Sequence, residues 1–273
     1  MTYSKRQELI AQLQKHGLYT QKRLGQNFLT DNTALKKIVR AADLKKTDFV
    51  VEIGPGLGVL TAELVRDAGQ VLAVELDERL IPVLEENVRA DNLKIINADA
   101  LQMPLPDLPY KLVANIPYYI TSPILNHFLQ PKTPSEKRPT LIVLLVQKEV
   151  AEKVCAVSGD HTVLSLQVQL FGRPEIAGHV PASSFFPAPD VDSAILKITP
   201  YPQPAISDTA LFFRLIHATF AQRRKTLSNS LRNGLGLEKD RIAALLEKAG
   251  IKPTARPQEL SLPDWQKLID AWT

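Results

Sequence analysis

The chain has 273 residues, and its 33 Lys and Arg against 29 Asp and Glu give a net charge of +4. This length is enough for one large domain and a smaller one, and 45% hydrophobic residues is ordinary for a globular protein. The single Cys155 excludes an internal disulfide and a cysteine cage for a metal, and no apolar run reaches the length of a membrane span. Because the N-terminus also lacks the apolar core of a signal peptide, the sequence predicts a cytoplasmic protein.

The charge is unevenly distributed along the chain. Residues 1–48 carry 10 basic and 4 acidic side chains, residues 49–199 carry 12 and 18, and residues 200–273 carry 11 and 7. Basic segments at both ends of an acidic middle suit a protein that holds a polyanion with its ends and a small cationic ligand in its middle. Uneven charge is also common on proteins that bind no nucleic acid, so the pattern favours nucleic acid only modestly.

The N-terminal part of the chain predicts two helices with an unusual segment between them. Residues 4–16 predict a short amphipathic helix, and Thr30 or Asp31 is expected to cap a second helix over residues 32–42. The segment KRLGQNFLTD at residues 22–31 combines a basic pair, a glycine and a polar–aromatic cluster, which is not typical of a core. A polar lead-in to a capped helix is the alternative interpretation.

A glycine-rich stretch, VVEIGPGLGVLT at residues 50–61, organises the rest of the chain. Residues 49–53 predict a buried strand, the alternating glycines predict a sharp turn, and residues 59–65 have helical spacing. This order is the opening of a nucleotide-binding βαβ unit. The G-x-G-x-G spacing differs from the dinucleotide fingerprint and from a P-loop, and it resembles motif I of S-adenosylmethionine-dependent methyltransferases. An ordinary turn that binds nothing is the alternative.

Carboxylates stand at the ends of the next two predicted strands. Glu75 follows the strand at residues 70–74, where nucleotide-binding sheets hold ribose hydroxyls. Asp77 is expected to cap a helix over residues 78–90. Asp99 follows the third strand and could accept a hydrogen bond from an adenine amino group. Solvated strand ends are the alternative, although its spacing from the glycine turn favours a ligand for Glu75.

The fourth predicted strand, residues 110–114, runs into NIPYYI at residues 115–120. Asn115 has a carbonyl that can accept from an exocyclic amine, Pro117 stiffens the loop, and Tyr118 offers a ring on which a base can stack. Ligands of open α/β sheets bind at the carboxyl ends of strands, so this loop should face the same crevice as the glycine turn. A turn with a buried tyrosine is the weaker alternative.

After residue 140 the sequence predicts both strands and helices as far as about residue 200, and only helices beyond it. A central strand is predicted over residues 140–146, a helix over 164–171, and strands over 175–180 and 191–199. The loop between the last two strands holds adjacent phenylalanines, which either fill the core or present a stacking face. Further helices are predicted near residues 208–221, 225–233, 238–249 and 263–271. The first junction between these helices carries three consecutive cations that suit phosphates, or else form a solvated helix end.

Seven segments together resemble the ribosomal RNA adenine N6-dimethyltransferase family, and they occur in that family's order. They are KRLGQNFL at 22–29, EIGPGLGVLT at 52–61, VELD at 74–77, NADAL at 97–101, NIPYYI at 115–120, FFPAPDVDS at 185–193 and FAQRRKTL at 220–227. Each is weak alone, and the combination is specific. The chain departs from the family pattern at Asp190, where a basic residue is usual, and at Tyr119, where asparagine is common. Both departures concern substrate contacts rather than the reaction.

The resemblance implies a fold and an activity. The fold is α/β, with a Rossmann-like class I methyltransferase domain over residues 1–200 and a small all-α domain over residues 201–273 that binds RNA or the ribosome. The sheet should have seven strands, mostly parallel, with one reversed edge strand. The activity is transfer of four methyl groups from S-adenosylmethionine to N6 of two adjacent adenosines near the 3′ end of small-subunit (16S) ribosomal RNA, in a pre-30S particle. No membrane is involved, and a monomer is expected because no exposed apolar stripe stands out.

The resemblance and the strand-end positions together name the expected site residues. The catalytic residues, which hold the target adenine, are Asn115, Ile116, Pro117, Tyr118 and Phe185. The cofactor-binding residues are Gln26, Asn27, Leu29, Glu52, Gly54, Gly56, Glu75, Leu76, Asp99, Ala100 and Asn115. The RNA-binding residues are Lys22, Arg23, Arg223, Arg224 and Lys225, and no metal site is expected.

Three other functions are weighed against this one. A ribosome-assembly factor could use the basic ends for docking without chemistry, although such a protein would not require Asn115 or Tyr118. An Erm-type 23S rRNA methyltransferase would share the reaction, but GQNFL and FAQRRKTL favour the small-subunit branch. A nicotinamide-dependent oxidoreductase is disfavoured by the glycine spacing and by NIPY.

Overall fold

The computed structural model describes residues 2–18, 26–131, 133, 136–222 and 224–272. Two compact units make up the chain, one from Met1–Ala151 with Glu175–Pro200 and the other from Glu152–Pro174 with Tyr201–Thr273. The sequence-based boundary at residue 200 therefore marks only one of the places where the chain passes between units. Residues 152–174 group with the C-terminal helices, although the sequence-based division places them in the first domain.

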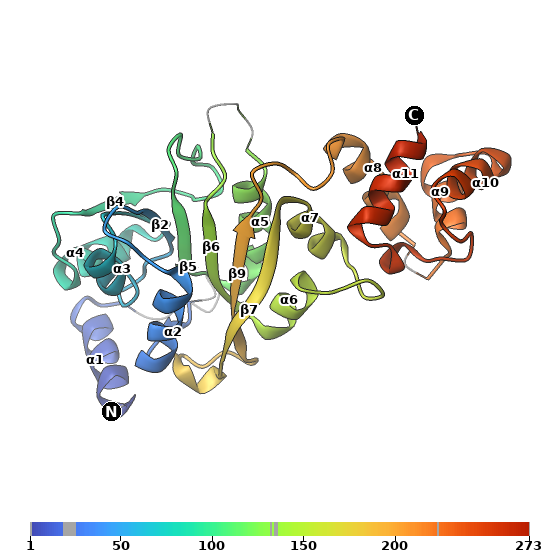
Figure 1. Cartoon of the computed structure of the whole chain (residues 1–273). Coiled ribbons are helices and arrows are strands. Elements are labelled where there is room, and N and C mark those ends of the chain that lie inside the picture. Colours follow the sequence, from blue (N-terminus) through green and yellow to red (C-terminus); the bar gives the residue numbers. More distant parts are fainter. Residues whose placement is uncertain (1, 19–25, 132, 134–135, 223, 273) are drawn as a thin grey trace. The chain divides into compact units, whose positions relative to one another are not determined.

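A seven-stranded sheet forms the centre of the first unit (Figure 1). Its strands, in spatial order, are β4 (Leu93–Asn97), β3 (Gln70–Glu75), β2 (Phe49–Ile53), β5 (Lys111–Asn115), β6 (Leu141–Gln147), β9 (Ser193–Pro200) and β7 (Gly172–Val180). The first five run parallel, and β9 runs antiparallel to β6. The expected seven-stranded, mostly parallel sheet is confirmed.

The expectation that the reversed strand lies at the edge is wrong. β9 lies between β6 and β7, and β7 is the edge strand. The burial patterns agree with this order, because most of β9 is buried, whereas the interior of β7 alternates between exposed and partly buried side chains. A strand that is covered on both faces belongs inside a sheet, while an alternating strand tolerates the edge.

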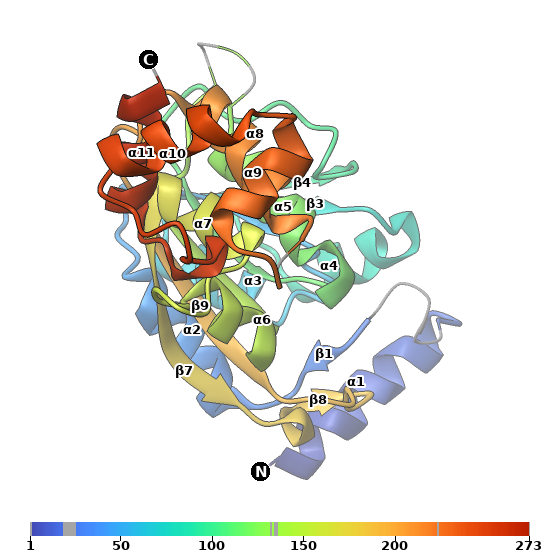
Figure 2. The ribbon, with the colours of Figure 1, turned by 90° about the vertical axis from the view of Figure 1, so that its right-hand side faces the viewer.

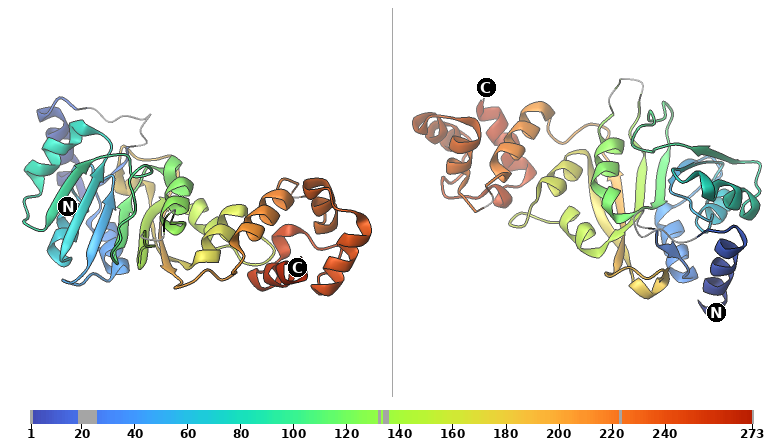
Figure 3. Two further views of the ribbon diagram at one scale, coloured as in Figure 1. Left: turned by 90° about the horizontal axis from the view of Figure 1, so that it is seen from above. Right: turned by 180° about the vertical axis from the view of Figure 1, so that it is seen from behind.

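Helices cover the sheet on both faces. The connection from β2 to β3 contains α3 (Thr61–Asp67), and the connection from β5 to β6 contains α5 (Thr121–Leu129), so the two connections move outward in opposite directions. Right-handed crossovers then place these two helices on opposite faces of the sheet. Figure 3 shows the ribbon from above and from behind. A crevice opens where the strand order reverses, between β2 and β5.

The buried face under α3 forms a continuous apolar cluster. It also receives α2 (Asn32–Ala42), which buries Leu35 and Ile38 against the sheet. Asp31 caps α2, as expected, because its carboxylate accepts a hydrogen bond of 2.7 Å from the Thr33 N–H. The predicted helix over residues 78–90 is shorter and consists of η2 (Glu78–Leu80) followed by α4 (Ile81–Asn87), because the chain becomes extended at Val88.

A two-stranded sheet that the sequence did not predict ties the N-terminal part to a distant loop. β1 (Phe28–Leu29) pairs antiparallel with β8 (Phe185–Phe186), which follows η4 (Ala182–Ser184). Thr30 extends the pairing, since its N–H donates to the Ser184 carbonyl at 2.8 Å. α1 (Thr2–Lys15) precedes this sheet and packs Leu9 and Leu13 into a cluster with Phe28.

The second unit is helical (Figure 2). Its helices are α7 (Val163–Phe171), α8 (Thr209–Phe220), α9 (Leu227–Leu235), α10 (Lys239–Lys248) and α11 (Leu262–Trp272), with η5 (Pro257–Glu259) before the last. α6 (Lys148–Val154) spans the boundary between the units. The fully buried Trp265 meets Phe212 edge to face at 6.1 Å between ring centroids. Within the described ranges, no helix combines the length and the apolar character needed to cross a bilayer.

Candidate active site

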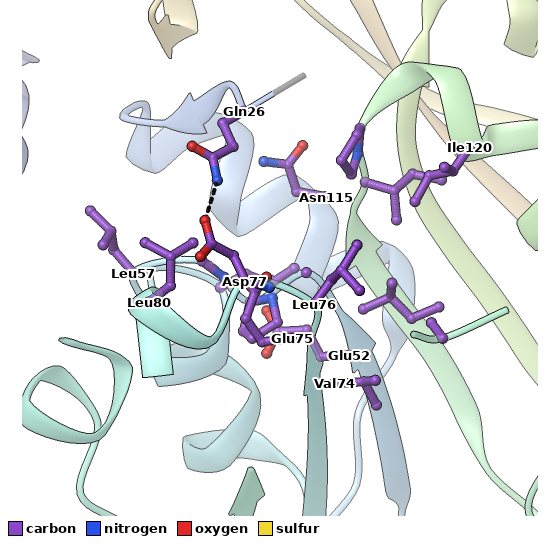
Figure 4. Close-up of a pocket in the computed structure, with 18 of the residues that line it drawn as sticks. Gln26, Glu52, Leu57, Val74, Glu75, Leu76, Asp77, Leu80, Asn115 and Ile120 are labelled. Atoms are coloured by element: carbon purple, nitrogen blue, oxygen red, sulfur yellow. Dashed lines mark hydrogen bonds between the residues drawn. The ribbon is translucent and has the colours of Figure 1, made fainter. Parts of the chain in front are cut away.

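A cavity of about 470 Å³ opens at the carboxyl ends of β2, β3, β4 and β5. It lies in the crevice where the strand order reverses, which is the expected ligand position in an open α/β sheet. All eleven residues expected to bind a cofactor line this cavity. So do Ile116, Pro117 and Tyr118, so the structure brings almost the whole expected site together (Figure 4).

The glycine turn leaves room for a ligand on one side and for packing on the other. Gly54, Gly56 and Gly58 all have positive φ, which L side chains rarely adopt. A Cβ atom at Gly54 would meet nothing within 4 Å, whereas one at Gly58 would lie 2.7 Å from atoms of Leu84 and Val88. Gly54 thus exposes backbone in the cavity, and Gly58 lets α4 approach the turn.

Glu75 connects the end of β3 to the glycine turn that follows β2. Its Oε2 accepts a hydrogen bond of 3.0 Å from the Gly56 N–H, and its Oε1 accepts one of 2.9 Å from the Asp77 N–H. Burial raises the pKa of Glu75, and these two donors act in the opposite direction. Each carboxylate oxygen keeps a lone pair. The side chain can therefore still accept hydrogen bonds from two hydroxyl groups of a ligand.

Glu52 lies beneath the turn and is almost completely buried, at 1% exposure. Burial raises the pKa of Glu52 to about 8, with a further contribution from the charge of Glu75, while the Thr61 hydroxyl acts in the opposite direction. Among the described residues, Glu52 Oε2 has no hydrogen-bond partner. At neutral pH the group is therefore mainly a neutral acid at the cavity floor.

The segment before α2 closes one side of the cavity. Gln26 Nε2 donates to Asp77 Oδ2 at 3.2 Å, a bond that is visible in Figure 4. Asp77 also caps η2, as expected, by accepting from the Arg79 N–H at 3.3 Å. The Asp77 carboxylate forms a salt bridge of 2.6 Å with the Arg79 guanidinium, and this bond lowers the pKa of Asp77.

Asn115 is held by the same N-terminal segment. Its Nδ2 donates a hydrogen bond of 3.2 Å to the backbone carbonyl of Asn27. No bond to Oδ1 is formed by any residue that the structure describes. The amide is therefore oriented with its nitrogen toward the chain and its oxygen available as an acceptor in the cavity.

Tyr118 is held by a hydrogen bond to the start of β9. It lies in η3 (Tyr118–Ile120), and its hydroxyl makes a hydrogen bond of 2.7 Å with Ser193 Oγ at the start of β9. Burial raises the pKa of Tyr118, so the phenol is neutral at physiological pH. Because both ends of the side chain are fixed, the ring has a defined plane in the lining of the cavity.

The structure places Phe185 away from the cavity lining. This ring is 4% exposed and packs in the apolar cluster with Leu29 and α2, and it does not line the cavity. The cause is the pairing of β1 with β8, in which Leu29 lies opposite Phe185. Of the two alternatives for this loop, the ring fills the core.

The expected RNA-binding residues are placed only in part. Arg224 and Lys225 are exposed between α8 and α9 of the second unit. Lys22, Arg23 and Arg223 lie outside the described residues. Among the residues described, no group of three or more His, Cys, Asp or Glu side chains could hold a metal ion.

Sequence reasoning missed several residues that line the cavity. They include Phe28, Leu57, Asp77, Leu80 and Tyr119. Phe28 could have been predicted, since it lies between two residues already assigned to the site, Asn27 and Leu29. In the structure its ring lies 3.2 Å from the position that a Cβ atom would take at Gly56. Leu57 and Leu80 carried no sequence signal, because they reach the cavity only through tertiary packing.

The sequence matches a known protein family and named relatives over most of its length. The family described as "Ribosomal RNA adenine dimethylase" matches residues 17–272. A protein of Dehalococcoides mccartyi named "Ribosomal RNA small subunit methyltransferase A" is 47% identical, with 96% of this chain and 91% of that protein covered. A protein of the same name from Streptococcus thermophilus is 44% identical, with 96% and 94% covered.

Two solved structures share the architecture. A dimethyladenosine transferase from Plasmodium falciparum superposes with a TM-score of 0.80 at 27% identity, over 90% of this chain and 97% of that one. The 23S rRNA methyltransferase ErmE gives a TM-score of 0.73 at 29% identity, over 90% and 99%. With its fold, its cavity and a match over nearly its whole length, this chain belongs to the ribosomal RNA adenine dimethylase family of methyltransferases.

Proposed function

We propose that this protein transfers methyl groups from S-adenosylmethionine to N6 of two adjacent adenosines near the 3′ end of small-subunit ribosomal RNA. The observation that carries the proposal is the Asn115 amide, whose free oxygen lies in the same cavity as the glycine turn and Glu75. The relatives named as small-subunit methyltransferases favour that subunit over the large one. The protein acts as a monomer on a pre-30S particle in the cytoplasm.

The residues of the cavity fit S-adenosylmethionine. The volume of about 470 Å³ is within the range of small-molecule sites. Glu75 can accept from the ribose hydroxyls, Asp99 from the adenine amino group, and the exposed Leu76 offers an apolar shelf for the base. The open backbone at Gly54 admits the amino-acid part. The bound cofactor supplies a methyl group that its sulfonium has already activated.

The chain's own residues bind and orient the target base. The adenine must leave its stack to enter a protein cavity. Tyr118 packs on one face of the base, and base–aromatic stacking is worth about 1–3 kcal/mol. Asn115 Oδ1 and the Ile116 carbonyl accept from the N6 hydrogens and so aim the nitrogen lone pair into the cofactor side of the cavity. Such positioning supplies most of the catalysis, and no side chain of NIPYYI has to act as a strong base.

Exposed cations account for RNA binding. Arg224 and Lys225 of the second unit neutralise phosphates, together with Arg223 and the N-terminal pair Lys22 and Arg23. This contribution is electrostatic and independent of sequence, so it should weaken steeply with salt. Recognition of the target adenosines then depends on the cavity rather than on these cations.

The proposal is tested with labelled S-adenosylmethionine and unmethylated small ribosomal subunits, followed by digestion of the RNA and separation of nucleosides. Formation of N6,N6-dimethyladenosine at two adjacent positions is the expected result. Labelling of large-subunit RNA instead would place the chain with ErmE, the 23S enzyme whose fold it shares. Absence of label on either RNA, with the cofactor still bound, would favour a ribosome-assembly factor.

A further inference from the structure

Tyr119 is a large aromatic side chain that the fold leaves uncovered at the cavity. It is 59% exposed and lines the cavity beside the half-buried Tyr118. Among the described residues, the large hydrophobic side chains that remain exposed are Leu76, Leu108, Tyr119, Val157, Val191 and Tyr201. Only Leu76 and Tyr119 of these line the cavity. Leu76 belongs to the part of the cavity proposed to bind the cofactor, the cofactor half, which also contains Gly54, Glu75 and Asp99. Tyr119 is therefore left without an assigned ligand.

The backbone around Tyr119 is well fixed although its ring is exposed. η3 begins after Pro117, and the Ile120 N–H donates to the Pro117 carbonyl at 3.2 Å. The Thr121 hydroxyl donates to the Tyr118 carbonyl at 3.0 Å, at the start of α5. Figure 4 shows Ile120, the last residue of this turn, among the residues that line the cavity. An aromatic residue on such a turn can stack with little loss of conformational entropy.

The two tyrosines of the turn point in different directions. Side chains follow each other at about 120° in a helix with three residues per turn. Tyr118 accordingly points inward, where its hydroxyl meets Ser193, and Tyr119 points outward to the rim. One ring is therefore fixed in the cavity wall, and the next ring is left exposed to solvent beside it.

Flipping one of two adjacent adenosines exposes a face of its neighbour. Unstacking of this kind costs a few kcal/mol unless another surface replaces the lost contact. Aromatic side chains do this in proteins that bind single-stranded RNA, because every base has a π-face. We propose that Tyr119 is a second base-stacking site, which holds the nucleobase next to the adenosine being methylated. This inference rests on the proposed function and adds a contact outside the methyl-transfer site.

Substitutions at Tyr119 test the stacking site in the full-length protein with unmethylated small subunits. Tyr119→Phe should retain kcat/KM for the RNA, since the ring is kept. Tyr119→Leu and Tyr119→Ala should lower it about 5- to 150-fold, the range for losing one base stack. Binding of S-adenosylmethionine, measured by calorimetry without RNA, should stay within about 2-fold for all three variants. Tyr201→Ala, which removes an exposed tyrosine of the second unit, is the matched control and should resemble the wild type.

An abasic nucleotide in the substrate gives the sharper test. Small subunits are reconstituted with an abasic residue on the 5′ or the 3′ side of one target adenosine. One of these should lower kcat/KM of the wild-type enzyme by about the same factor as Tyr119→Ala. Combining that RNA with Tyr119→Ala should cause no further loss, because both changes remove the same contact.

Full activity of Tyr119→Ala on normal subunits would overturn the stacking site. Multiplication of the losses from the variant and both abasic substrates would overturn it as well. A failure of the proposed function is distinguishable from these, since the wild-type enzyme would then form no dimethyladenosine at all. Loss of cofactor binding in Tyr119→Ala with retained binding in Tyr119→Phe would also count against the site, because it would assign the ring to the cofactor half.

Discussion

The two halves of the cavity are held together in different ways. The cofactor half is built from neighbouring strands, and its central bond joins Gly56 to Glu75, only 19 residues apart. The part of the cavity proposed to bind the target base, the substrate half, lies on the loop that carries Asn115 and Tyr118. These two side chains are held by atoms 88 and 75 residues away, the Asn27 carbonyl and Ser193 Oγ respectively. The cofactor half is therefore a local construction, and the substrate half depends on long-range contacts.

This difference has a consequence for how changes in the protein should act. The cofactor half buries two carboxylates and packs glycines against helices, so changes there should affect the free energy of unfolding and cofactor binding together. The substrate half is partly exposed and is held by single hydrogen bonds, so changes there should affect methyl transfer without loss of stability.

The largest effect is expected at Asn115. Asn115→Ala should lower the rate of methyl transfer at least about 100-fold, because the target amine loses its acceptor and its alignment. Cofactor affinity, measured by calorimetry, should change by less than about 3-fold. Asn115→Asp separates the two roles, since it keeps an acceptor but places a carboxylate oxygen against the Asn27 carbonyl. We expect a loss nearly as large for this variant. Retained transfer in Asn115→Ala would remove the residue from the mechanism.

A change in the glycine turn should act on the cofactor half. Gly58→Ala combines a φ of +87° with a Cβ only 2.7 Å from Leu84 and Val88, so it should destabilise the first unit by about 3 kcal/mol. Cofactor affinity should fall as well, because α4 and the turn must separate. Gly236→Ala is the matched control, with a φ of +66° and nothing within 4 Å of its Cβ. This control should lower the free energy of unfolding by about 1 kcal/mol, because it adds backbone strain without a steric clash. Equal thermal midpoints for the two variants would contradict the packing argument.

Glu52 gives the cofactor half a distinct dependence on pH. The folded pKa of about 8 lies above the ordinary value of 4.5, so the folded state keeps a proton that the unfolded state releases in this interval. The stability due to this group is complete below about pH 4.5 and is lost as pH rises to 8, at up to about 1.4 kcal/mol per pH unit. Glu52→Gln should remove this dependence. The thermal midpoint of the variant should therefore rise relative to that of the wild type as the pH increases. Parallel midpoints of the two proteins from pH 5 to pH 8 would show that the group ionises normally.

The sequence predicted the local half of the site better than the long-range half. The strand, turn and helix signals around Gly54 and the strand ends at Glu75 and Asp99 depend on nearby residues, and they fall in one cavity. The pairing of Phe28 with Phe186 joins segments 158 positions apart by sequence number and has no periodic signal of its own. The sequence did not predict this pairing, which places Phe185 in the apolar core and outside the cavity lining.

The fold shows the same limit. Periodicity predicted most helices and strands to within a few residues, since hydrophobic spacing is a local property. The position of β9 inside the sheet and the grouping of residues 152–174 with the C-terminal helices follow from packing between distant elements. Neither is recorded in the spacing of a single segment, although the apolar run of β9 was consistent with an internal strand.

The smallest expected effect tests whether the long-range contact to Tyr118 is a single functional unit. Ser193→Ala and Tyr118→Phe each remove one partner of the 2.7 Å hydrogen bond and keep the aromatic ring. A net hydrogen bond is worth about 0.5–1.5 kcal/mol, so each variant should lower kcat/KM for the RNA about 2- to 10-fold while cofactor affinity is retained. The double variant should lose no more than the larger single loss, because the two changes remove the same bond. If the losses multiply instead, Ser193 acts through β9 rather than through the ring, and the substrate half is less dependent on this long-range contact than its geometry indicates.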